Sequence, residues 1–453
     1  PMNLQGRAIH FMGIGGMGVS VLAELARHEG ALVSGCDLYK NDRTEYLASL
    51  GVPIAIGHDP GHVSGADIFV HTSAVKPDHP ERLAAGRLCA SFRRGAFLAR
   101  LLEGKRVYGV SGTHGKTTTT WLLGQLLTAA GTDPTILLGG LPVGGKTNLR
   151  IGASDVAVAE LDESDESFLE PRLVLAVVTS AEPDHLDHYK TPAAVAAAYR
   201  RFARGVEPSG VLVASADDPG ARSVFAAQEG AKVSAGLRED AMLKAVDLDA
   251  EGFRQSFLLR DGGRSLGRFD LPLPGAHNVQ NALCALAAAH AAAAPWEALR
   301  AALGRCTGVA RRFELVGERR GVRVIEDYAH HPTEIAAALR AARGVHAGRV
   351  IALFQPHLYS RTQFFCDAFG EALSAADEVL LVDIYPAREE PLPGVTAKIV
   401  VEAVRQRNAA VSGPYARDEA AGVLARRVKE GDLVIVLGAG DVGACAHELV
   451  ERL

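Results

Sequence analysis

The residues with the clearest chemical meaning form a glycine-rich segment, residues 112–120. It follows an apolar run at residues 107–110 and precedes a periodic apolar stretch at 121–127, so we expect a strand, a turn and a helix in that order. Such a turn directs backbone N–H groups and the positive end of a helix dipole at an anion. Lys116 is placed to reach terminal phosphates, and the hydroxyl of Thr117 to ligate Mg²⁺. The segment therefore predicts ATP binding; the alternative is a turn that only caps a helix.

This loop departs from the usual phosphate loop at one position, because Val110 stands where the first glycine is expected. We interpret it as a shortened loop whose backbone still surrounds a phosphate chain. The residues expected to contact ATP here are Gly112, Thr113, His114, Gly115, Lys116, Thr117 and Thr118.

Two polar turns, residues 160–165 and 182–189, each follow a strand-like apolar run. Polar groups at a strand end are costly to bury unless they meet a cation or water. We expect Glu160, at the strand tip, and His185 to ligate divalent metal together with Thr117. Two metals that share Glu160 would clamp a transferred phosphoryl group. The residues that follow Glu160 are expected to form a solvated acidic turn.

A second glycine pattern lies near the N-terminus, between a short apolar run and a helical pattern. It is typical of loops that bind nucleotides, and a UDP-sugar suits it as well as NAD does. The alternative is a tight turn with no ligand. The residues expected to contact the nucleotide are Gly13, Gly15, Gly16, Gly18 and Asp37, with His71, Thr72 and Ser73 at the end of a later strand.

The last polar groups lie in the second half of the chain. Asn278 and Asn281 share one face of a helix start, where carboxamides bind an adenine edge or cap the helix. Arg312 offers a guanidinium to phosphate. Residues 326–334 and 355–361 follow neighbouring strands and are rich in His, Tyr and Arg, which indicates an anionic or amphoteric substrate.

The elements that must position these residues alternate between short apolar runs and helical patterns. This alternation predicts an α/β protein with doubly wound, mainly parallel sheets. The expected strands are residues 8–12, 31–36, 68–70, 107–110, 156–158, 173–178, 256–259, 268–273, 322–325, 350–354, 379–382 and 433–437; residues 83–102 are expected to be mostly helical. The pattern restarts twice, so we expect three domains, at residues 1–103, 104–308 and 309–453.

Composition narrows the class of protein. The net charge of −5 gives no basic surface for nucleic acid. The six cysteines form no C-x-x-C pair, so we expect neither a zinc site nor a disulfide framework. Neither a signal peptide nor a membrane span is expected. We therefore predict a cytoplasmic protein without nucleic-acid or membrane partners, either a monomer or a weak homodimer.

Together these segments resemble the Mur ligases, in the family's order and over nearly the whole chain. The matching motifs are G-I-G-G-M-G, G-T-H-G-K-T-T-T, E-x-D-E-S-D, D-H-L-D, H-N-x-x-N-A, R-R-F-E, D-Y-A-H-H-P-T-E and F-Q-P-H-x-Y-S-R. The resemblance implies a UDP-binding Rossmann-like domain, a central P-loop ATPase domain and a C-terminal Rossmann-like domain that binds an amino acid.

The resemblance also implies the activity. It is greatest to the members that join L-alanine to the lactyl carboxylate of UDP-N-acetylmuramate through an acyl phosphate, with ATP and Mg²⁺ or Mn²⁺, in peptidoglycan precursor synthesis. It implies that Lys116 holds the β- and γ-phosphates. Thr117, Glu160 and His185 would then bind metal, Asn278, Asn281 and Arg312 would contact ATP, and Tyr328, His330, His357 and Arg361 would line the amino-acid pocket.

Three positions depart from the family pattern: Glu326 replaces an aspartate, Leu358 an arginine, and residues 179–181 an asparagine-containing stretch. A ligase that recycles a tripeptide onto the same sugar nucleotide shares most of the motifs. A non-catalytic relative that binds a UDP-sugar and an NAD-dependent oxidoreductase are further alternatives.

Overall fold

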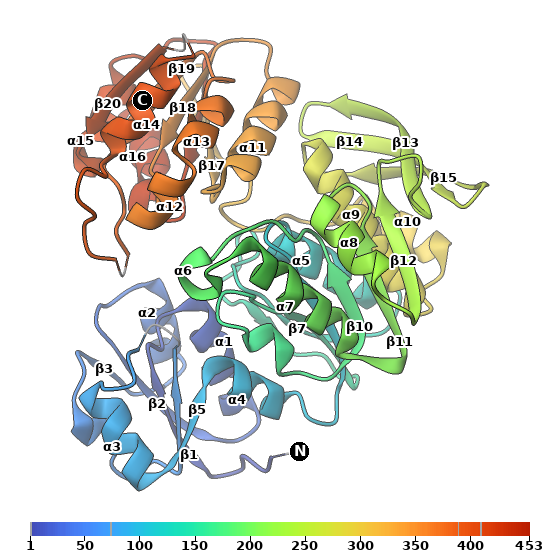
Figure 1. Ribbon diagram of the computed structural model, residues 1–453, viewed down its shortest axis with the longest axis vertical. Coiled ribbons are helices and arrows are strands. Elements are labelled where there is room, and N and C mark those ends of the chain that lie inside the picture. Colours follow the sequence, from blue (N-terminus) through green and yellow to red (C-terminus); the bar gives the residue numbers. More distant parts are fainter. Residues whose placement is uncertain (1, 73–74, 388, 408–409) are drawn as a thin grey trace. The chain divides into compact units, whose positions relative to one another are not determined.

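The computed structural model describes residues 2–72, 75–387, 389–407 and 410–453. The chain divides into two compact units. Unit 1 contains residues 1–246, 259–267 and 280–306, and unit 2 contains residues 247–258, 268–279 and 307–453. Three sheets, most of whose strands are parallel, confirm the predicted α/β class (Figure 1).

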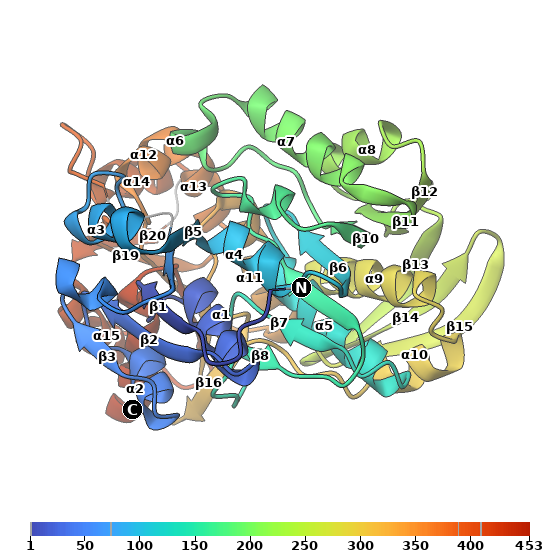
Figure 2. The same ribbon diagram turned by 90° about the horizontal axis from the view of Figure 1, so that it is seen from below.

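The first sheet is fully parallel and belongs to unit 1. Its order is β3-β2-β1-β4-β5, with β1 at Ala8–Met12, β2 at Leu32–Asp37, β3 at Ile54–Ile56, β4 at Ile68–His71 and β5 at Ala90–Arg93. The helices are α1 (Met17–His28), α2 (Asp42–Ser49), α3 (Pro80–Leu88), α4 (Arg94–Leu101) and the short 3₁₀ helix η1 (Pro60–Val63). The apolar residues of α1, α2 and α4 pack on one face, and those of η1 and α3 on the other (Figure 2).

The segment 83–102 is mostly helical, as predicted, because the end of α3 and all of α4 lie in it. The strand β5, which was not predicted, separates the two helices and pairs with β4 at the edge of the sheet. The backbone hydrogen bonds of that pairing override the local helical pattern.

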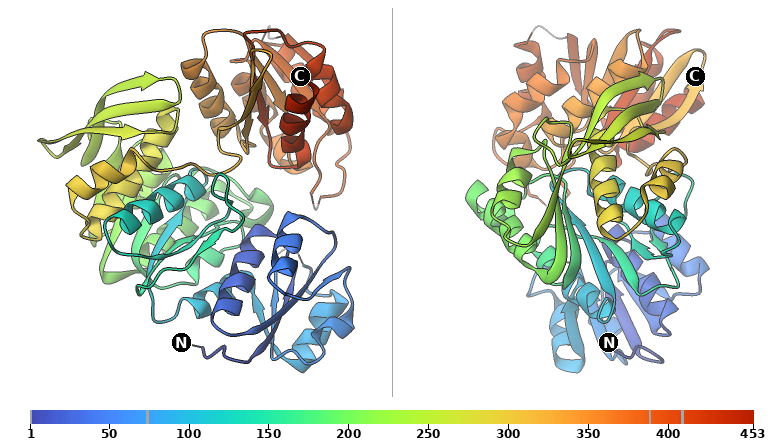
Figure 3. Two further views of the ribbon diagram at one scale, coloured as in Figure 1. Left: turned by 180° about the vertical axis from the view of Figure 1, so that it is seen from behind. Right: turned by 90° about the vertical axis from the view of Figure 1, so that its right-hand side faces the viewer.

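The second sheet has ten strands in the order β15-β14-β13-β12-β11-β10-β6-β9-β7-β8. They are β6 (Arg106–Ser111), β7 (Thr135–Leu137), β8 (Leu149–Arg150), β9 (Val156–Glu160), β10 (Leu173–Val178), β11 (Val206–Ser215), β12 (Ala231–Gly236), β13 (Leu243–Glu251), β14 (Arg254–Asp261) and β15 (Arg264–Leu271). The helices are α5 (Lys116–Ala129), α6 (Leu186–Tyr189), α7 (Pro192–Arg204), α8 (Pro219–Ala226), α9 (Ala276–Ala291) and α10 (Trp296–Leu303), with η2 at Ser167–Leu169. Seen edge-on, α7 and α8 cover one face, and α5 and α10 the other (Figure 3).

The third sheet belongs to unit 2 and has the order β16-β17-β21-β18-β19-β20. Only the pair β16 (Glu314–Arg319) and β17 (Val322–Asp327) is antiparallel; β18 (Val350–Phe354), β19 (Glu378–Val382), β20 (Ala410–Tyr415) and β21 (Leu433–Leu437) are parallel to their neighbours and to β17. The helices are α11 (Pro332–Val345), α12 (Tyr359–Phe364), α13 (Cys366–Leu373), α14 (Ala397–Arg405), α15 (Arg417–Ala425) and α16 (Ala444–Arg452), with η3 at Asp441–Gly443.

Strand register explains why distant segments meet. In unit 1, Glu160 pairs with Val110 and Val178 pairs with Ser111, so the segments after β6, β9 and β10 leave the same edge of the sheet. The carboxyl ends of parallel strands are the usual place for ligands in such folds. Among the helices that the structure describes, none has both the length and the apolar character needed to cross a membrane.

Candidate functional site

The glycine-rich loop after β6 ends in a left-handed residue, Gly115, at φ 80°. Helix α5 begins at the next residue, Lys116, and within the described chain no side chain caps its first turn. The loop therefore presents a helix N-terminus whose N–H groups suit an anion such as phosphate.

Gly115 also allows a close approach. A Cβ built there would lie 2.2 Å from Oδ1 of Asn281, which brings one of the two predicted asparagines next to the loop. The other, Asn278, donates from Nδ2 to the carbonyl of Pro274 at 2.7 Å, so its carboxamide stabilises the start of α9.

Replacing Gly115 with alanine is expected to lower ATP-dependent activity by about 10²-fold, since a displacement of about 1 Å in a phosphate site has effects of that size. The matched control is Gly131→Ala. Gly131 has a similar φ of 88° but nothing within 4 Å of the added Cβ. The control is expected to lose about 1 kcal/mol of stability and to keep its activity. Steady-state assays on both variants check this, and equal activity losses would contradict it.

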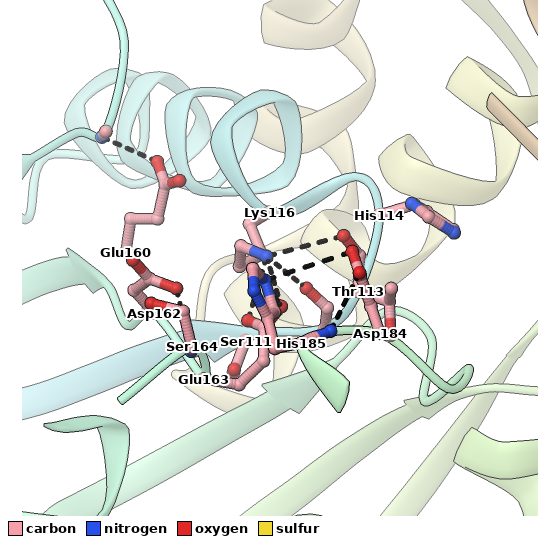
Figure 4. A network of polar contacts seen from close by, with 12 residues as sticks. Ser111, Thr113, His114, Lys116, Glu160, Asp162, Glu163, Ser164, Asp184 and His185 are labelled. Carbon is pink, nitrogen blue, oxygen red and sulfur yellow. Dashed lines mark hydrogen bonds and ion pairs between the residues drawn. The ribbon is translucent and has the colours of Figure 1, made fainter. Parts of the chain in front are cut away.

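Lys116 lies at the centre of a polar network (Figure 4). Its Nζ donates to the carbonyl of Gly112 at 2.6 Å and to the two carboxylate oxygens of Glu163 at 2.8 and 3.0 Å. Burial alone would lower the pKa of Lys116, but the carboxylates of Glu163 and its neighbours outweigh burial and raise the pKa. Lys116 is therefore a cation held at the mouth of the loop, beside an acidic partner.

Glu163 is more deeply buried than the sequence interpretation predicted. It was expected in a solvated acidic turn, but it is 2% exposed. The turn folds inward because the ammonium group of Lys116 compensates the buried carboxylate. The spacing of the acidic residues predicts a turn at the end of a strand. It does not predict which of their carboxylates points into the protein.

Glu160, the last residue of β9, is held through both carboxylate oxygens. Oε1 accepts from the hydroxyl of Thr117 at 3.0 Å, and Oε2 accepts from the backbone N–H of Gly139 at 2.6 Å. A hydroxyl and a carboxylate placed together beside a phosphate loop are the oxygen donors that a hard divalent cation takes.

His185 precedes α6 in a left-handed conformation, at φ 51°. Its Nε2 lies 3.6 Å from Oε1 of Glu163 and 3.9 Å from Oδ2 of Asp184. Burial would lower the pKa of His185, but the contact with Glu163 and the neighbouring acidic charges raise it. One ligand atom each from Asp162, Glu163 and His185 lies within 4.8 Å of the others, a donor set that fits a divalent cation. The three predicted metal residues thus fall into two groups, Thr117 with Glu160, and His185 with this acidic pair.

Arg94, on α4, is a site residue with no local sequence signal. Its Nη2 lies 3.4 Å from Oδ2 of Asp162 and donates to Oγ of Ser167 at 3.3 Å. Burial would raise the pKa of Asp162, but Arg94, Lys116 and His185 outweigh it and hold that pKa well below its usual range. A Cβ added to Gly18 would lie 2.7 Å from Nη1 of Arg94, so Arg94 joins the N-terminal glycine pattern to the acidic turn.

Residues 179–181, where the chain departs from the family pattern, support the phosphate loop. The hydroxyl of Ser180 accepts from the N–H of His114 at 2.8 Å. Thr113 accepts from the N–H of Glu182 at 2.9 Å through its own hydroxyl. The loop and the turn that carries His185 are therefore linked directly.

The N-terminal glycine pattern lies where a nucleotide loop is expected, between β1 and α1. Oδ2 of Asp37 accepts from the N–H of Gly15 at 2.8 Å. A Cβ on Gly13 would lie 2.9 Å from Cγ2 of Thr72. His71 is buried, which lowers its pKa. Ser73 lies outside the described residues.

In unit 2 the four predicted amino-acid residues form a connected group. Nδ1 of His330 lies 3.0 Å from the carbonyl of Tyr328, and the rings of His330 and His357 are 5.9 Å apart. Nη1 of Arg361 lies 3.2 Å from Nδ1 of His357. Arg312 lies over the Tyr328 ring, 4.9 Å from its centroid. These cationic and aromatic groups suit a carboxylate ligand.

Two further residues shape this group. His357 stacks on Tyr385, with ring centroids 5.6 Å apart, and sequence reasoning missed Tyr385 because it follows a different strand. Leu358 is buried, at φ 69°, and its N–H donates to the carbonyl of Tyr385 at 2.9 Å. An apolar side chain at 358 leaves Arg361 as the guanidinium beside His357.

Asp327, at the end of β17, joins two of the motifs. Its carboxylate accepts from the N–H of Phe313 at 2.8 Å and from that of Ala329 at 2.7 Å. Burial raises the pKa of Asp327 to about 6, although Arg312 and these N–H groups act against it. A carboxyl group whose pKa is raised on folding stabilises the folded protein at a pH below the pKa of the group in the unfolded chain. That stability is lost as the pH rises through the pKa of the group in the folded protein.

As the pH rises from about 4 to about 7, ionisation of Asp327 is therefore expected to lower the free energy of unfolding of unit 2 by roughly 3 kcal/mol. Asp327→Asn stays neutral, so its stability relative to the unsubstituted protein should rise over that interval. Hydrogen exchange of the β17 amides measures this difference. A difference that does not change with pH would contradict it.

Comparisons with known proteins agree with this arrangement. Three family models match consecutive parts of the chain: "Mur ligase family, catalytic domain" matches residues 8–106, "Mur ligase middle domain" residues 110–289, and "Mur ligase, glutamate ligase domain" residues 311–440. The UDP-N-acetylmuramate–L-alanine ligase of Kineococcus radiotolerans is 45% identical over 98% of this chain and 96% of its own length. That of Sorangium cellulosum is 41% identical over 99% and 96%.

Solved structures show the same likeness. The UDP-N-acetylmuramate–alanine ligase of Thermotoga maritima superposes with a TM-score of 0.84 at 28% identity, covering 98% of both chains. A murein peptide ligase from Psychrobacter arcticus shares the fold, with a TM-score of 0.73 at 24% identity, over 99% of this chain and 98% of its own.

Proposed function

This chain belongs to the Mur ligase family, and we propose that it joins L-alanine to the lactyl carboxylate of UDP-N-acetylmuramate, with conversion of ATP to ADP and phosphate. The observation that carries the proposal is the identity of 40–45% over nearly the full chain to relatives that bear the name of this ligase. The residue groups of both units support it. The reaction is a cytoplasmic step of peptidoglycan precursor synthesis, performed by a monomer or weak homodimer.

Each of the three sheet-containing regions binds a different substrate. Residues 1–103 bind the UDP-sugar through the glycine pattern and Asp37, residues 104–308 bind ATP, and residues 309–453 bind the amino acid. In the structure, Oδ2 of Asp37 accepts from the N–H of Gly15. A phosphate at this turn would take that N–H and free Asp37 for a hydroxyl of the ligand.

The first chemical step transfers the γ-phosphoryl group of ATP to the lactyl carboxylate. Lys116 neutralises charge on the β- and γ-phosphates, and the N–H groups at the start of α5 hold them. Asn281, beside Gly115, and Asn278 and Arg312 complete the nucleotide contacts. Because this step involves little covalent chemistry by the protein, alignment and charge neutralisation carry most of the rate enhancement.

The donor groups of the site fit divalent cations, and we assign Mg²⁺, with Mn²⁺ as an alternative. Thr117 and Glu160 would hold one ion, and His185 with Asp162 and Glu163 would hold a second. When bound, these ions neutralise negative charge on the phosphoryl group. His185 must lose its proton to act as a ligand, and its contact with Glu163 orients the ring.

The second step is the attack of the L-alanine amine on the acyl phosphate. The N–C bond forms, the amine loses a proton, and phosphate leaves as the C–O bond breaks. Arg361 and the imidazoles of His330 and His357 hold the carboxylate of alanine, and Tyr328 borders the pocket. Leu358 supplies an apolar wall beside Arg361.

Phosphate release with UDP-N-acetylmuramate, ATP and Mg²⁺ tests the proposal across amino acids and peptides. L-Alanine is expected to stimulate release most strongly, with glycine and serine as weaker acceptors. Stimulation by the tripeptide L-alanyl-γ-D-glutamyl-meso-diaminopimelate, but not by alanine, would identify a recycling ligase instead. Binding of the UDP-sugar without phosphate release would indicate a non-catalytic relative.

A further inference from the structure

A second cluster of metal-ligating side chains lies in the first sheet, on the face that α3 and η1 cover. At its centre is Glu81 of α3, whose side chain is fully buried. Around it lie His10 from β1, Cys36 from β2, and His58 and His62 from the segment after β3. None of these residues takes part in the ATP site or the amino-acid group.

The ligand atoms converge on one carboxylate oxygen. Oε1 of Glu81 lies 3.0 Å from Sγ of Cys36, 3.3 Å from Nε2 of His10 and 3.6 Å from Nδ1 of His62. One ligand atom from each of these four residues lies within 4.8 Å of all the others. Bond lengths of about 2.0–2.3 Å in tetrahedral zinc sites correspond to ligand separations of roughly 3.4–3.7 Å.

The side chains of this cluster are more deeply buried than those of most polar networks at protein surfaces. The side chains of His10 and Glu81 are 4% and 0% exposed, and Cys36 is buried. Within the described residues, Nε2 of His10 and Oε2 of Glu81 are buried atoms without a hydrogen-bond partner of good geometry. Each atom has one ionic contact instead, Nε2 of His10 with Oε1 of Glu81 at 3.3 Å and Oε2 of Glu81 with Nδ1 of His58 at 3.1 Å. Buried polar atoms usually satisfy their hydrogen-bonding capacity, and a bound cation would do so here.

The surrounding groups also orient the ligands as in a metal site. Nδ1 of His10 lies 3.0 Å from Oγ of Ser34, which directs Nε2 toward the cluster. Nδ1 of His58 lies 3.1 Å from Oε2 of Glu81 and 3.2 Å from Sγ of Cys36. Outer contacts of this kind fix the ring orientation of metal-binding histidines.

We propose that His10, Cys36, His62 and Glu81 form a structural zinc site, with His58 as its outer support. One thiolate, two imidazoles and one carboxylate make the mixed donor set that Zn²⁺ binds in tetrahedral geometry. Protein side chains would occupy all four coordination positions of the ion, which is typical of structural rather than catalytic zinc sites. The ion would tie β1, the end of β2, η1 and α3 together, next to Asp37.

The proposed site differs from an expectation from the sequence. The absence of a C-x-x-C pair argued against zinc, but the four ligands come from four separate segments that the sheet brings together. Cys36 gives up its proton to bind the ion, so zinc uptake releases a proton and shields the thiol.

Metal binding to the full-length protein tests the proposal. The protein is stripped with a chelator, incubated with Zn²⁺ or Co²⁺, desalted and assayed for bound metal. We expect the unsubstituted protein to retain one equivalent per chain more than either ligand variant, and to show a sulfur-to-cobalt charge-transfer band with Co²⁺. Cys36→Ser and His62→Ala should lose this equivalent or weaken it by more than about tenfold, because even outer-shell changes at metal sites have effects of that size. Cys284→Ser, at a buried cysteine in α9, is the matched control and should bind normally.

The His62→Ala variant distinguishes loss of the metal site from misfolding. His62 is the most exposed of the four ligands, so its replacement should disturb the fold least, and circular dichroism will show whether the variant folds. Zn²⁺ should raise the melting temperature of the unsubstituted protein and of Cys284→Ser, but not that of either ligand variant. No retained metal, or equal retention by a folded His62→Ala, would overturn the proposal and leave a hydrogen-bond network around Glu81.

Discussion

Lys116→Met is expected to lower ATP-dependent phosphate release by at least about 10²–10³-fold, the size of effect seen when one preorganised charge-stabilising group is removed from an active site. Lys116 is the cation at the mouth of the phosphate loop, and its Nζ is held by Gly112 and Glu163. Methionine keeps most of the side-chain volume but removes the charge. The loss should appear mainly in kcat, because the phosphoryl charge is redistributed in the transition state.

Lys105→Met is the matched control. Lys105 precedes β6, whereas Lys116 follows it, so the two lysines lie at opposite ends of the same strand. The control should retain nearly full activity. A Lys116→Met protein that is folded, by circular dichroism, and still releases phosphate at the normal rate would contradict the assigned role.

The second large effect is on stability. Glu163→Gln is expected to destabilise unit 1 by roughly 3 kcal/mol at neutral pH, because it leaves the partly buried ammonium of Lys116 and the imidazole of His185 without their shared carboxylate. Since Glu163 raises the pKa of Lys116, the contribution of the pair is fully present at neutral pH. It is lost as the pH rises through that raised pKa.

A double-mutant cycle separates the pair from its surroundings. Lys116→Met combined with Glu163→Gln removes both charges, so the double variant should be more stable than the sum of the two single effects predicts, by about 1–3 kcal/mol. It should remain inactive, because the cation that serves ATP is still missing. Urea unfolding of the four proteins measures the coupling. Additive single effects would show that the contact between Lys116 and Glu163 contributes no net stability.

Elements with strong local patterns could be predicted from the sequence. The strands at Leu173–Val178, Val350–Phe354 and Leu433–Leu437 are continuous apolar runs buried between helices, and their predicted bounds are confirmed. Strand β5 could not be predicted in this way, because its short sequence has helical neighbours and its pairing with β4 is a tertiary contact.

The candidate site was predictable where a motif carries the chemistry and not where a distant element supplies it. The loop around Lys116 and the turn at Glu160 follow from spacing. The inward position of Glu163, by contrast, depends on a lysine from another strand end, and Arg94 comes from α4, a helix that packs on a different sheet. The cluster around Glu81 is the extreme case, since its members are separated in sequence and only the stacking of β1, β2 and α3 brings them together.

The central claim is that an acyl phosphate of UDP-N-acetylmuramate is formed and then captured by L-alanine. The most direct test uses UDP-N-acetylmuramate in which both oxygens of the lactyl carboxylate are heavy oxygen, with ATP, Mg²⁺ and L-alanine, followed by mass spectrometry of the released phosphate. We predict one heavy oxygen in each phosphate, because a carboxylate oxygen becomes the bridging atom and leaves with the phosphoryl group. Phosphate with no heavy oxygen, released while the alanyl product forms, would contradict the mechanism.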